Sequence, residues 1–323
     1  MDISSRVALI RRNAVEVVEE KELELLLEKK SRPVVYCGYE VSGEVHLGHL
    51  VTVSKLIDFQ NANCKVIVLF ADWHTWLNQK GSWEKIEQLT KLWKKVFVGL
   101  GLDKVEYILG STFQRKSDYI DDVMRIAVKT TINRALRSMQ EIARDIEHAK
   151  VSQVIYPFMQ IVDMKALKVD IATAGIEQRK IHMLGREVLP DIGYKQVIYV
   201  HTPLVPSLQG PGGKMSSSIP ESMVSVRDSP EEIKKKINKA YCPEGVVADN
   251  PVLAIAKLII FPRVGSYKVE RAEKFGGDLE FSSYAEMESA FVKKQLHPLD
   301  LKNSVVKYLV EILKPVRAVF SSG

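Results

Sequence analysis

The stretch from Tyr36 to His49 decides the fold and reads Tyr-Cys-Gly-Tyr-Glu-Val-Ser-Gly-Glu-Val-His-Leu-Gly-His. A short apolar run leads into it and apolar residues at helical spacing follow it, so we predict a strand before it and a helix after it. Between them, Gly38 and Gly43 let a ligand approach the backbone closely. The predicted helix N-terminus adds partial positive charge. This arrangement presents backbone N–H groups and the imidazoles of His46 and His49 to a phosphate.

Strands and helices alternate through the first two thirds of the chain. We expect strands at 34–36, 65–72, 105–108, 169–172 and 197–200, and helices at 5–30, 46–61, 83–100, 118–147 (in one or two pieces), 151–164 and 177–189. This alternation predicts an α/β fold with a doubly wound, Rossmann-like parallel sheet. Ligands of such folds bind beyond the carboxyl ends of the strands. Segments 36–43, 72–74 and 172–178 follow strands and can line that crevice.

The pattern changes after Val226. Ser229 and Pro230, followed by two glutamates, form a helix start with a cap and a proline in the first turn. Further helices are expected at 250–260, 284–294 and 300–313. We therefore predict two domains, an α/β catalytic domain over 1–226 and a mainly helical domain over 227–323.

Composition is that of an ordinary globular protein, with 46% hydrophobic and 27% charged residues in 323. A net charge of +6 is compatible with an anionic partner. The three scattered cysteines, Cys37, Cys64 and Cys242, suit neither a disulfide framework nor a zinc site, so we expect a reducing, cytoplasmic location. The N-terminus does not resemble a signal peptide, and no apolar run reaches the roughly 18 residues of a membrane span.

A second stretch bears on phosphate chemistry, Gly210-Pro-Gly-Gly-Lys214-Met-Ser216-Ser217-Ser218. A flexible loop that carries a cation and hydroxyls can close on a polyphosphate during a reaction. By itself this is equally a solvated Gly/Ser loop, and a lone His-x-Gly-His motif also fits other adenylyl transferases. The two motifs together, in this order, favour nucleotide chemistry.

The two motifs resemble the signatures of class I aminoacyl-tRNA synthetases. His46-Leu47-Gly48-His49 matches the first signature, with leucine in place of the commoner isoleucine. Lys214-Met-Ser-Ser-Ser matches the second, with Ser217 in place of the commoner second lysine. Lys214 is therefore the one side-chain cation of this motif.

A third stretch concerns the amino acid. Tyr156, Gln160 and Asp163 are spaced by four and three residues, so they share one face of a helix, where they are either pocket groups or a partly exposed face. With Tyr36 and the segment 175–183, they resemble tyrosyl-tRNA synthetases of the compact archaeal and eukaryotic type. This resemblance covers essentially the whole chain.

The resemblance implies a role for each matching residue. For tyrosine, Tyr36 and Asp163 contact the phenol hydroxyl, Tyr156, Gln160 and Gln178 hold the ammonium, and His74 is either a substrate neighbour or a packing residue. For ATP, Gly38 and Gly43 give room, His46 and His49 contact the phosphates, and Lys214 and Ser216 close over the pyrophosphate. The catalytic group is thus His46, His49, Lys214 and Ser216.

The implied reaction has two steps. The carboxylate of L-tyrosine attacks the α-phosphate of Mg-ATP to give tyrosyl-adenylate and pyrophosphate, and the 3′-terminal ribose of tRNA(Tyr) then takes the tyrosyl group. The protein mainly positions groups and stabilises charge. We expect Mg²⁺ to arrive with ATP, no metal site made by the protein alone, no prosthetic group, and a homodimer.

Two groups of residues resemble the RNA contacts of this family. Arg134, Arg137, Arg144, Arg179, Lys180 and Met183 match the acceptor-stem surface, although a solvated basic helix face is the alternative. In the C-terminal half, an anticodon-binding domain by resemblance, the matching residues are Phe275, His297 and Asp300. An aromatic ring can stack on an unpaired base and a carboxylate can accept from a base edge; otherwise Phe275 is core and Asp300 is a helix cap.

Three other functions compete with this one. A tryptophanyl-tRNA synthetase shares the fold and signatures but should lack an acidic phenol reader at Asp163. A small-metabolite adenylyltransferase needs no anticodon domain. A regulatory RNA-binding relative needs no intact Lys214 loop or histidine pair.

Overall fold

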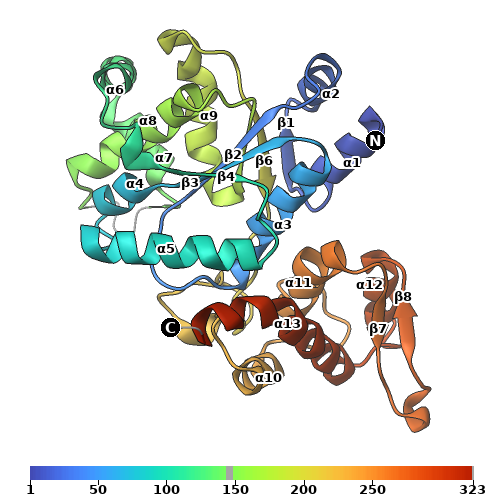
Figure 1. Ribbon diagram of the computed structural model, residues 1–323. Helices are drawn as coiled ribbons and strands as arrows, with labels where there is room; N and C mark the ends of the chain where they lie inside the picture. The colour runs from blue at the N-terminus through green and yellow to red at the C-terminus, as the bar shows by residue number, and fades with distance from the viewer. Residues whose placement is uncertain (143–147, 322–323) are drawn as a thin grey trace. The chain divides into compact units, whose positions relative to one another are not determined.

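The computed structural model describes residues 1–142 and 148–321, which form two compact units (Figure 1). The first unit comprises residues 1–42, 55–94 and 102–203, and the second comprises 43–54, 95–101 and 204–323. The long C-terminal segment of the second unit therefore begins at Leu204, whereas the sequence pattern placed a domain boundary near residue 226. The catalytic and anticodon-binding roles of the two predicted domains stay predictions.

The first unit is built on a six-stranded, mostly parallel sheet in the order β1-β6-β5-β2-β3-β4. Its strands are β1 (Glu16–Val18), β2 (Val34–Tyr39), β3 (Lys65–Phe70), β4 (Glu106–Leu109), β5 (Ile171–Gly175) and β6 (Ile198–Thr202). The chain runs outward from β2 to β3 and β4, then returns to β5 on the other side of β2. Tyr36 pairs with Ile67 on one side and Ala172 on the other, so it lies where the direction of winding reverses.

The prediction of a continuous helix over 5–30 was wrong. The segment forms α1 (Ile3–Arg11), β1 and α2 (Glu20–Lys29), and β1 pairs antiparallel with β6, so the sheet is not wholly parallel. Asn13 and Glu19 have positive φ values of 55° and 61°, which a helix interior excludes. The three β-branched valines between them suit a short strand.

The other helices of this unit follow the expected periods with altered ends, except for the short helix that begins at Asp72, which was not predicted. They are α4 (Asp72–Leu77), α6 (Ser117–Lys129), α7 (Ile132–Met139), α8 (Val151–Ala166) and α9 (Arg179–Val188); α3 (Leu47–Asn61) and α5 (Trp83–Gly99) contribute residues to both units. The predicted strand 65–72 ends at Phe70, because Asp72 already begins α4. The region 118–147 forms two helices, and its residues 143–147 lie outside the described residues.

The core of the first unit lies between the sheet and the group α6 to α9. Side chains of Tyr36, Ala172 and Tyr199 from the sheet join Tyr119 and Ile161 from the helices in one buried cluster. Helix α8 packs against α4, α6, α7 and α9, and ten of its residues are buried. The polar side chains of Tyr156, Gln160 and Asp163 on α8 therefore lie in the protein interior.

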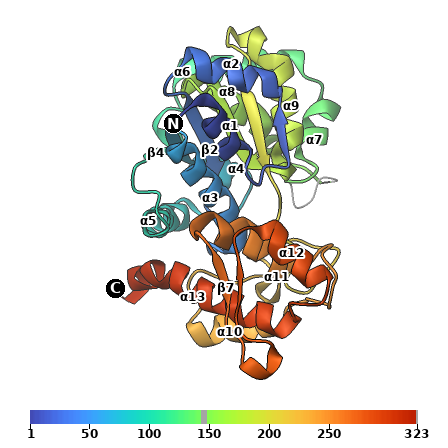
Figure 2. The ribbon, with the colours of Figure 1, turned by 90° about the vertical axis from the view of Figure 1, so that its right-hand side faces the viewer.

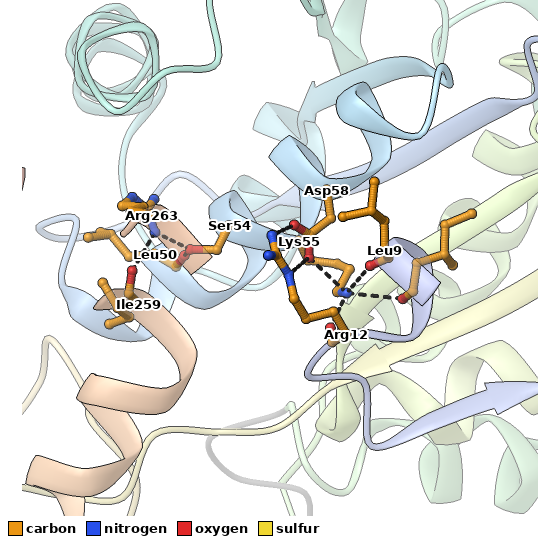
Figure 3. Close-up of polar contacts among 9 residues, drawn as sticks. Leu9, Arg12, Leu50, Ser54, Lys55, Asp58, Ile259 and Arg263 are labelled. Atoms are coloured by element: carbon orange, nitrogen blue, oxygen red, sulfur yellow. Dashed lines mark hydrogen bonds and ion pairs between the residues drawn. The ribbon is translucent and has the colours of Figure 1, made fainter. Parts of the chain in front are cut away.

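A buried lysine closes the C-terminal end of α1 (Figure 3). Lys55 Nζ donates to the backbone carbonyls of Leu9 at 3.2 Å, Ile10 at 3.0 Å and Arg12, and it contacts Asp58 Oδ2 at 3.1 Å. The last carbonyls of a helix lack partners within the helix, and a lysine satisfies them here. Burial lowers the pKa of Lys55, while the charge of Asp58 opposes that shift.

The second unit is mainly helical after Leu204 (Figure 2). Its helices are α10 (Pro230–Lys239), α11 (Pro251–Ile255), the π-helix Ala256–Ile260, α12 (Tyr284–Val292) and α13 (Pro298–Ser321). Ser229 and Glu232 form the capping box of α10, as the sequence predicted. A hairpin of β7 (Tyr267–Val269) and β8 (Leu279–Phe281) was not predicted. Among the described residues, no helix is both long and apolar enough to cross a membrane.

Candidate active site

Asp163 is the chemical centre of a buried polar cluster in the first unit. Its Oδ1 accepts hydrogen bonds from Tyr119 Oη and Gln114 Nε2, each at 2.8 Å. Among the described residues, its Oδ2 has no hydrogen-bond partner, and His74 Nε2 lies 3.8 Å away. Burial raises the pKa of Asp163 to about 7, although the two donors oppose the rise. Asp163 Oδ2 is therefore a buried acceptor that is free to bind a donor, and leaving it unpaired lowers the stability of the fold.

Tyr36 lies in the same cluster. Its side chain is buried, and its pKa is raised well above the usual value by burial and by the charge of Asp163. The phenol therefore stays protonated and acts as a hydrogen-bond donor. Gly38 leaves room for it, because a Cβ at that position would lie 2.7 Å from Tyr36 Oη. Only glycine fits here without displacing the phenol.

His74 packs within this cluster and also faces its open acceptor. Its ring meets that of Tyr156 edge-on, with centroids 4.7 Å apart, and its Nδ1 lies 3.2 Å from Gln114 Nε2. Burial lowers the pKa of His74 to about 3, so the ring is neutral. Since Gln114 Nε2 is a donor, Nδ1 accepts and Nε2 carries the proton. His74 is thus a packing histidine beside Asp163, and its contact with substrate remains a prediction.

The other three predicted residues lie on α8 and in the turn after β5. Gln160 Nε2 donates to Gln178 Oε1 at 3.3 Å, which joins α8 to the turn that follows β5. The phenol of Tyr156 is buried, and its pKa is raised well above the usual value by burial and by the nearby Glu40 carboxylate. All six residues predicted for tyrosine therefore lie in the first unit: Tyr36, His74, Tyr156, Gln160, Asp163 and Gln178.

Gln114, Tyr119 and Glu40 belong to this cluster, but the sequence singled out none of them, although Glu40 lies in the segment 36–43 that was expected to line the crevice. Glu40 accepts from Asn78 Nδ2 at 2.8 Å and pairs with Lys80. One signal was available, because Glu40 follows β2 and the other two follow β4. The rule that strand ends line the crevice, applied to the strand predicted at 105–108, would have drawn attention to the segment after it.

Asp72 holds the loop after β4 in place. It begins α4, and its Oδ1 accepts from the backbone N–H groups of Trp73 at 2.9 Å and Ser111 at 2.8 Å. A Cβ on Gly110 would lie 2.5 Å from Gln114 Oε1 and 3.0 Å from Asp72 Oδ1. The glycine and the carboxylate together let Gln114 reach Asp163.

His46 and His49, in the second unit, are oriented by the backbone. His46 Nδ1 accepts from Gly48 N at 3.1 Å, and His49 Nδ1 accepts from His46 N at 3.1 Å. Each imidazole therefore carries its proton on Nε2, where it is a donor suited to a phosphate oxygen. Burial, with the charge of Lys214, lowers the pKa of His46 to about 4, so the ring is neutral.

Two backbone N–H groups of the Lys214 loop donate hydrogen bonds within the same unit. Met215 N donates to Val205 O at 3.1 Å, and Ser216 N donates to Ser222 Oγ at 3.1 Å. Gly43 has a φ of +68°, and a Cβ there would lie 2.8 Å from Ser217 Oγ. The serine that replaces a commoner lysine thus packs against the glycine turn before α3.

The start of α3, with His46 just before it and His49 in its first turn, is anchored twice within the second unit. Leu47 N donates to Val224 O at 3.0 Å. About two turns further on, Arg263 Nη1 donates to Ser54 Oγ and, at 2.9 Å, to Ile259 O, while Ser54 Oγ donates to Leu50 O at 2.6 Å (Figure 3). These contacts fix the helix start that presents the imidazoles.

The residues predicted for the acceptor stem lie on the neighbouring helices α7 and α9. Arg137 is exposed, and Met183 packs partly against the core. The other cations carry partners: Arg134 pairs with Glu187, Arg179 with Glu16, and Lys180 with Glu141. Arg144 lies outside the described residues.

The predicted anticodon residues lie in the second unit. The alternative that Phe275 is a core residue is wrong, because 62% of its surface is exposed. At the start of α13, Leu299 N donates to His297 Nδ1 at 3.1 Å, so His297 supplies a cap contact. Asp300 is half-buried in the first turn of that helix.

Comparison with known proteins places the chain in a class. Residues 28–314 match the family model described as tRNA synthetases class I (W and Y). The chain therefore belongs to the class I aminoacyl-tRNA synthetases.

Individual relatives narrow the family further. A tyrosine–tRNA ligase of Archaeoglobus fulgidus is 52% identical over 98% of each chain, and one of Methanopyrus kandleri is 49% identical over 100% of this chain and 99% of that one. A crystal structure of the A. fulgidus tyrosyl-tRNA synthetase with L-tyrosine is also 52% identical, has a TM-score of 0.96, and covers 98% of this chain and 99% of its own. Within its class, the chain belongs to the tyrosine–tRNA ligase family, and the tryptophanyl alternative is not favoured.

Proposed function

We propose that the protein activates L-tyrosine with ATP and transfers it to the 3′-terminal ribose of tRNA(Tyr). The observation that carries the tyrosine assignment is the buried Asp163, whose Oδ2 has no hydrogen-bond partner among the described residues while Tyr36 lies nearby. A phenol hydroxyl satisfies that acceptor, whereas phenylalanine leaves it unpaired. A site of this kind rejects the analogue without the hydroxyl by about 10⁵, which is the magnitude known for another tyrosyl enzyme.

In this proposal the first unit holds the amino acid. Asp163 and Tyr36 bind the phenol hydroxyl, one as acceptor and the other as donor. Gln160, Gln178 and Tyr156 bind the ammonium group. The neutral His74 lies beside Asp163 and adds no charge there.

The second unit contributes the groups for ATP. Gly43 leaves the backbone of the turn accessible to the nucleotide, and Gly38, which lies inside β2 in the first unit, is assigned to the same role. His46 and His49 donate their Nε2 protons to phosphate oxygens, and Lys214 and Ser216 stabilise the pyrophosphate as it leaves. Mg²⁺ enters as part of the Mg-ATP substrate. The tyrosine carboxylate displaces pyrophosphate at the α-phosphate, and positioned donors stabilise the charge that develops.

Transfer to RNA completes the reaction. The terminal ribose hydroxyl attacks the activated carbonyl, and AMP leaves. We assign Arg137, Arg179, Lys180 and Met183 to the acceptor stem, and Phe275, His297 and Asp300 to the anticodon. The exposure of Phe275 supports stacking on an unpaired base. We further propose a cytoplasmic homodimer, and three free thiols suit such a compartment.

Pyrophosphate exchange driven by single amino acids tests the assignment. We expect exchange with tyrosine and at least 10⁴-fold less, in kcat/KM, with phenylalanine or tryptophan. Exchange that is faster with tryptophan would sink the proposal. Tyrosine-dependent exchange with no charging of tRNA would leave activation standing and remove the RNA half.

A further inference from the structure

Arg179 is held by a bidentate ion pair that the proposed function does not use. Its Nε donates to Glu16 Oε2 at 2.7 Å and its Nη2 donates to Glu16 Oε1 at 2.8 Å. About half of the arginine side chain remains exposed, at 46%, against 28% for the glutamate. Such fork-to-fork pairs fix the plane of the guanidinium as well as its position.

Glu16 is itself anchored from the protein interior. His201 Nδ1 lies 3.1 Å from Glu16 Oε2, and His201 Nε2 lies 2.9 Å from His182 Nδ1. Burial lowers the pKa of both histidines, so both rings are neutral. A carboxylate only accepts, so His201 carries its proton on Nδ1 and accepts at Nε2 from His182 Nδ1–H. One set of tautomers therefore satisfies the whole chain of contacts.

This network of contacts begins and ends on the same helix, α9. Arg179 and His182 are three residues apart on α9, and Glu16 and His201 are paired residues of β1 and β6. The guanidinium is therefore braced against the sheet through Glu16, and α9 is braced through the two histidines. β1 is the antiparallel strand that the sequence did not predict, and Glu16 is its first residue.

We propose that Glu16 is a positioning residue for tRNA, holding the Arg179 guanidinium in the orientation that receives the acceptor end. This inference rests on the proposed function of Arg179. The ion pair occupies the edge formed by Nε and Nη2, and it leaves both N–H groups of Nη1 and one of Nη2 for a phosphate or a guanine edge. The arginine thus meets RNA already ordered, and binding is spared the cost of ordering a long side chain.

The opposite role, in which Glu16 competes with RNA for the arginine, makes the opposite prediction. Removing a competitor would tighten tRNA binding, whereas removing a positioning group weakens it. The sign of one measured change therefore separates the two roles.

The test is Glu16→Gln in the full chain, which keeps the side-chain volume and removes the charge. We expect KM for a transcript of tRNA(Tyr) to rise about 3- to 10-fold, the range for one side chain that must be ordered on binding. KM for tyrosine and for ATP in pyrophosphate exchange should stay at the wild-type values. Glu106→Gln is the matched control. Glu106 pairs with Lys65 at 2.8 Å, and both are first residues of their strands, β4 and β3, whereas Glu16 pairs with His201 near the last residue of β6.

A double-mutant cycle with Arg179→Gln decides whether Glu16 acts through the arginine. In the Arg179→Gln background, Glu16→Gln should change KM for tRNA by less than about twofold. A full effect in that background, a lower KM in the single variant, or a change no larger than that of Glu106→Gln would overturn the inference. Wild-type protein that neither exchanges pyrophosphate with tyrosine nor charges tRNA would instead refute the proposed function. Thermal unfolding of each variant identifies any loss of folded protein.

Discussion

Replacing Tyr119 by phenylalanine tests whether the charge of Asp163 reads the substrate phenol. Tyr119 Oη lies 2.8 Å from both Asp163 Oδ1 and Met159 O, and it has one proton to donate. When Asp163 is ionised, the carboxylate is the stronger acceptor and takes this bond. When Asp163 is protonated, the hydroxyl can turn to the Met159 carbonyl. The bond therefore favours the ionised form of Asp163.

The size of the effect follows from that switch. A hydrogen bond to a charged group is worth roughly 1.5–3 kcal/mol. We take the lower end of this range because, when Asp163 is protonated, the Tyr119 hydroxyl still has Met159 O as an acceptor. A difference of about 1.5 kcal/mol corresponds to about one pKa unit. The pKa of Asp163, raised by burial to about 7, should rise by about one unit more in Tyr119→Phe. An acid with a higher pKa loses its charge at a higher pH.

The assay is the pH dependence of KM for tyrosine in pyrophosphate exchange. In the wild type, KM should rise as the pH falls through about 7, because the carboxylate becomes protonated. In Tyr119→Phe the same rise should begin about one pH unit higher. At pH 7.5, KM should therefore be severalfold above the wild type, and the two should converge near pH 9.

The matched control is Tyr194→Phe, which removes a hydroxyl that donates to the Val169 carbonyl at 2.9 Å. It should leave the pH profile unchanged. If the profile of Tyr119→Phe coincides with that of Tyr194→Phe, the ionisation of Asp163 does not govern tyrosine binding and the reasoning fails.

Three further perturbations test other parts of the site. Gly38→Ala places a Cβ 2.7 Å from Tyr36 Oη, so KM for tyrosine should rise at least tenfold; an unchanged KM would show that the phenol moves freely. Lys214→Ala should lower kcat of pyrophosphate exchange about 10²-fold with little change in KM for tyrosine, as stopped-flow or steady-state kinetics can establish. Ser54→Ala removes one of the two acceptors of Arg263 Nη1 and leaves the Ile259 carbonyl, so urea unfolding should report a loss of about 1 kcal/mol; equal midpoints would contradict the anchoring of α3.

Local pattern alone predicted much of the fold and of the proposed site. Helical and strand periods are properties of neighbouring residues, so the strand before Gly38, the helix after His46 and the cap at Ser229 followed from the sequence. The shared face of Tyr156, Gln160 and Asp163 also followed, since residues three and four apart meet on any helix. Motif resemblance then led to the class and to the amino acid.

Contacts between distant segments needed the tertiary structure. Gln114 and Tyr119 reach Asp163 from more than forty residues away, and no local pattern reports such a meeting. The short strand at Glu16 forms because β6 offers an edge, although its surroundings favour helix. The opening stretch predicted a strand, a glycine turn and a helix start that suit a phosphate. Only the tertiary structure decided the charge of the buried groups, because loss of contact with water favours the neutral form of each. Burial keeps His46 and His74 uncharged and raises the pKa of Asp163 to about 7.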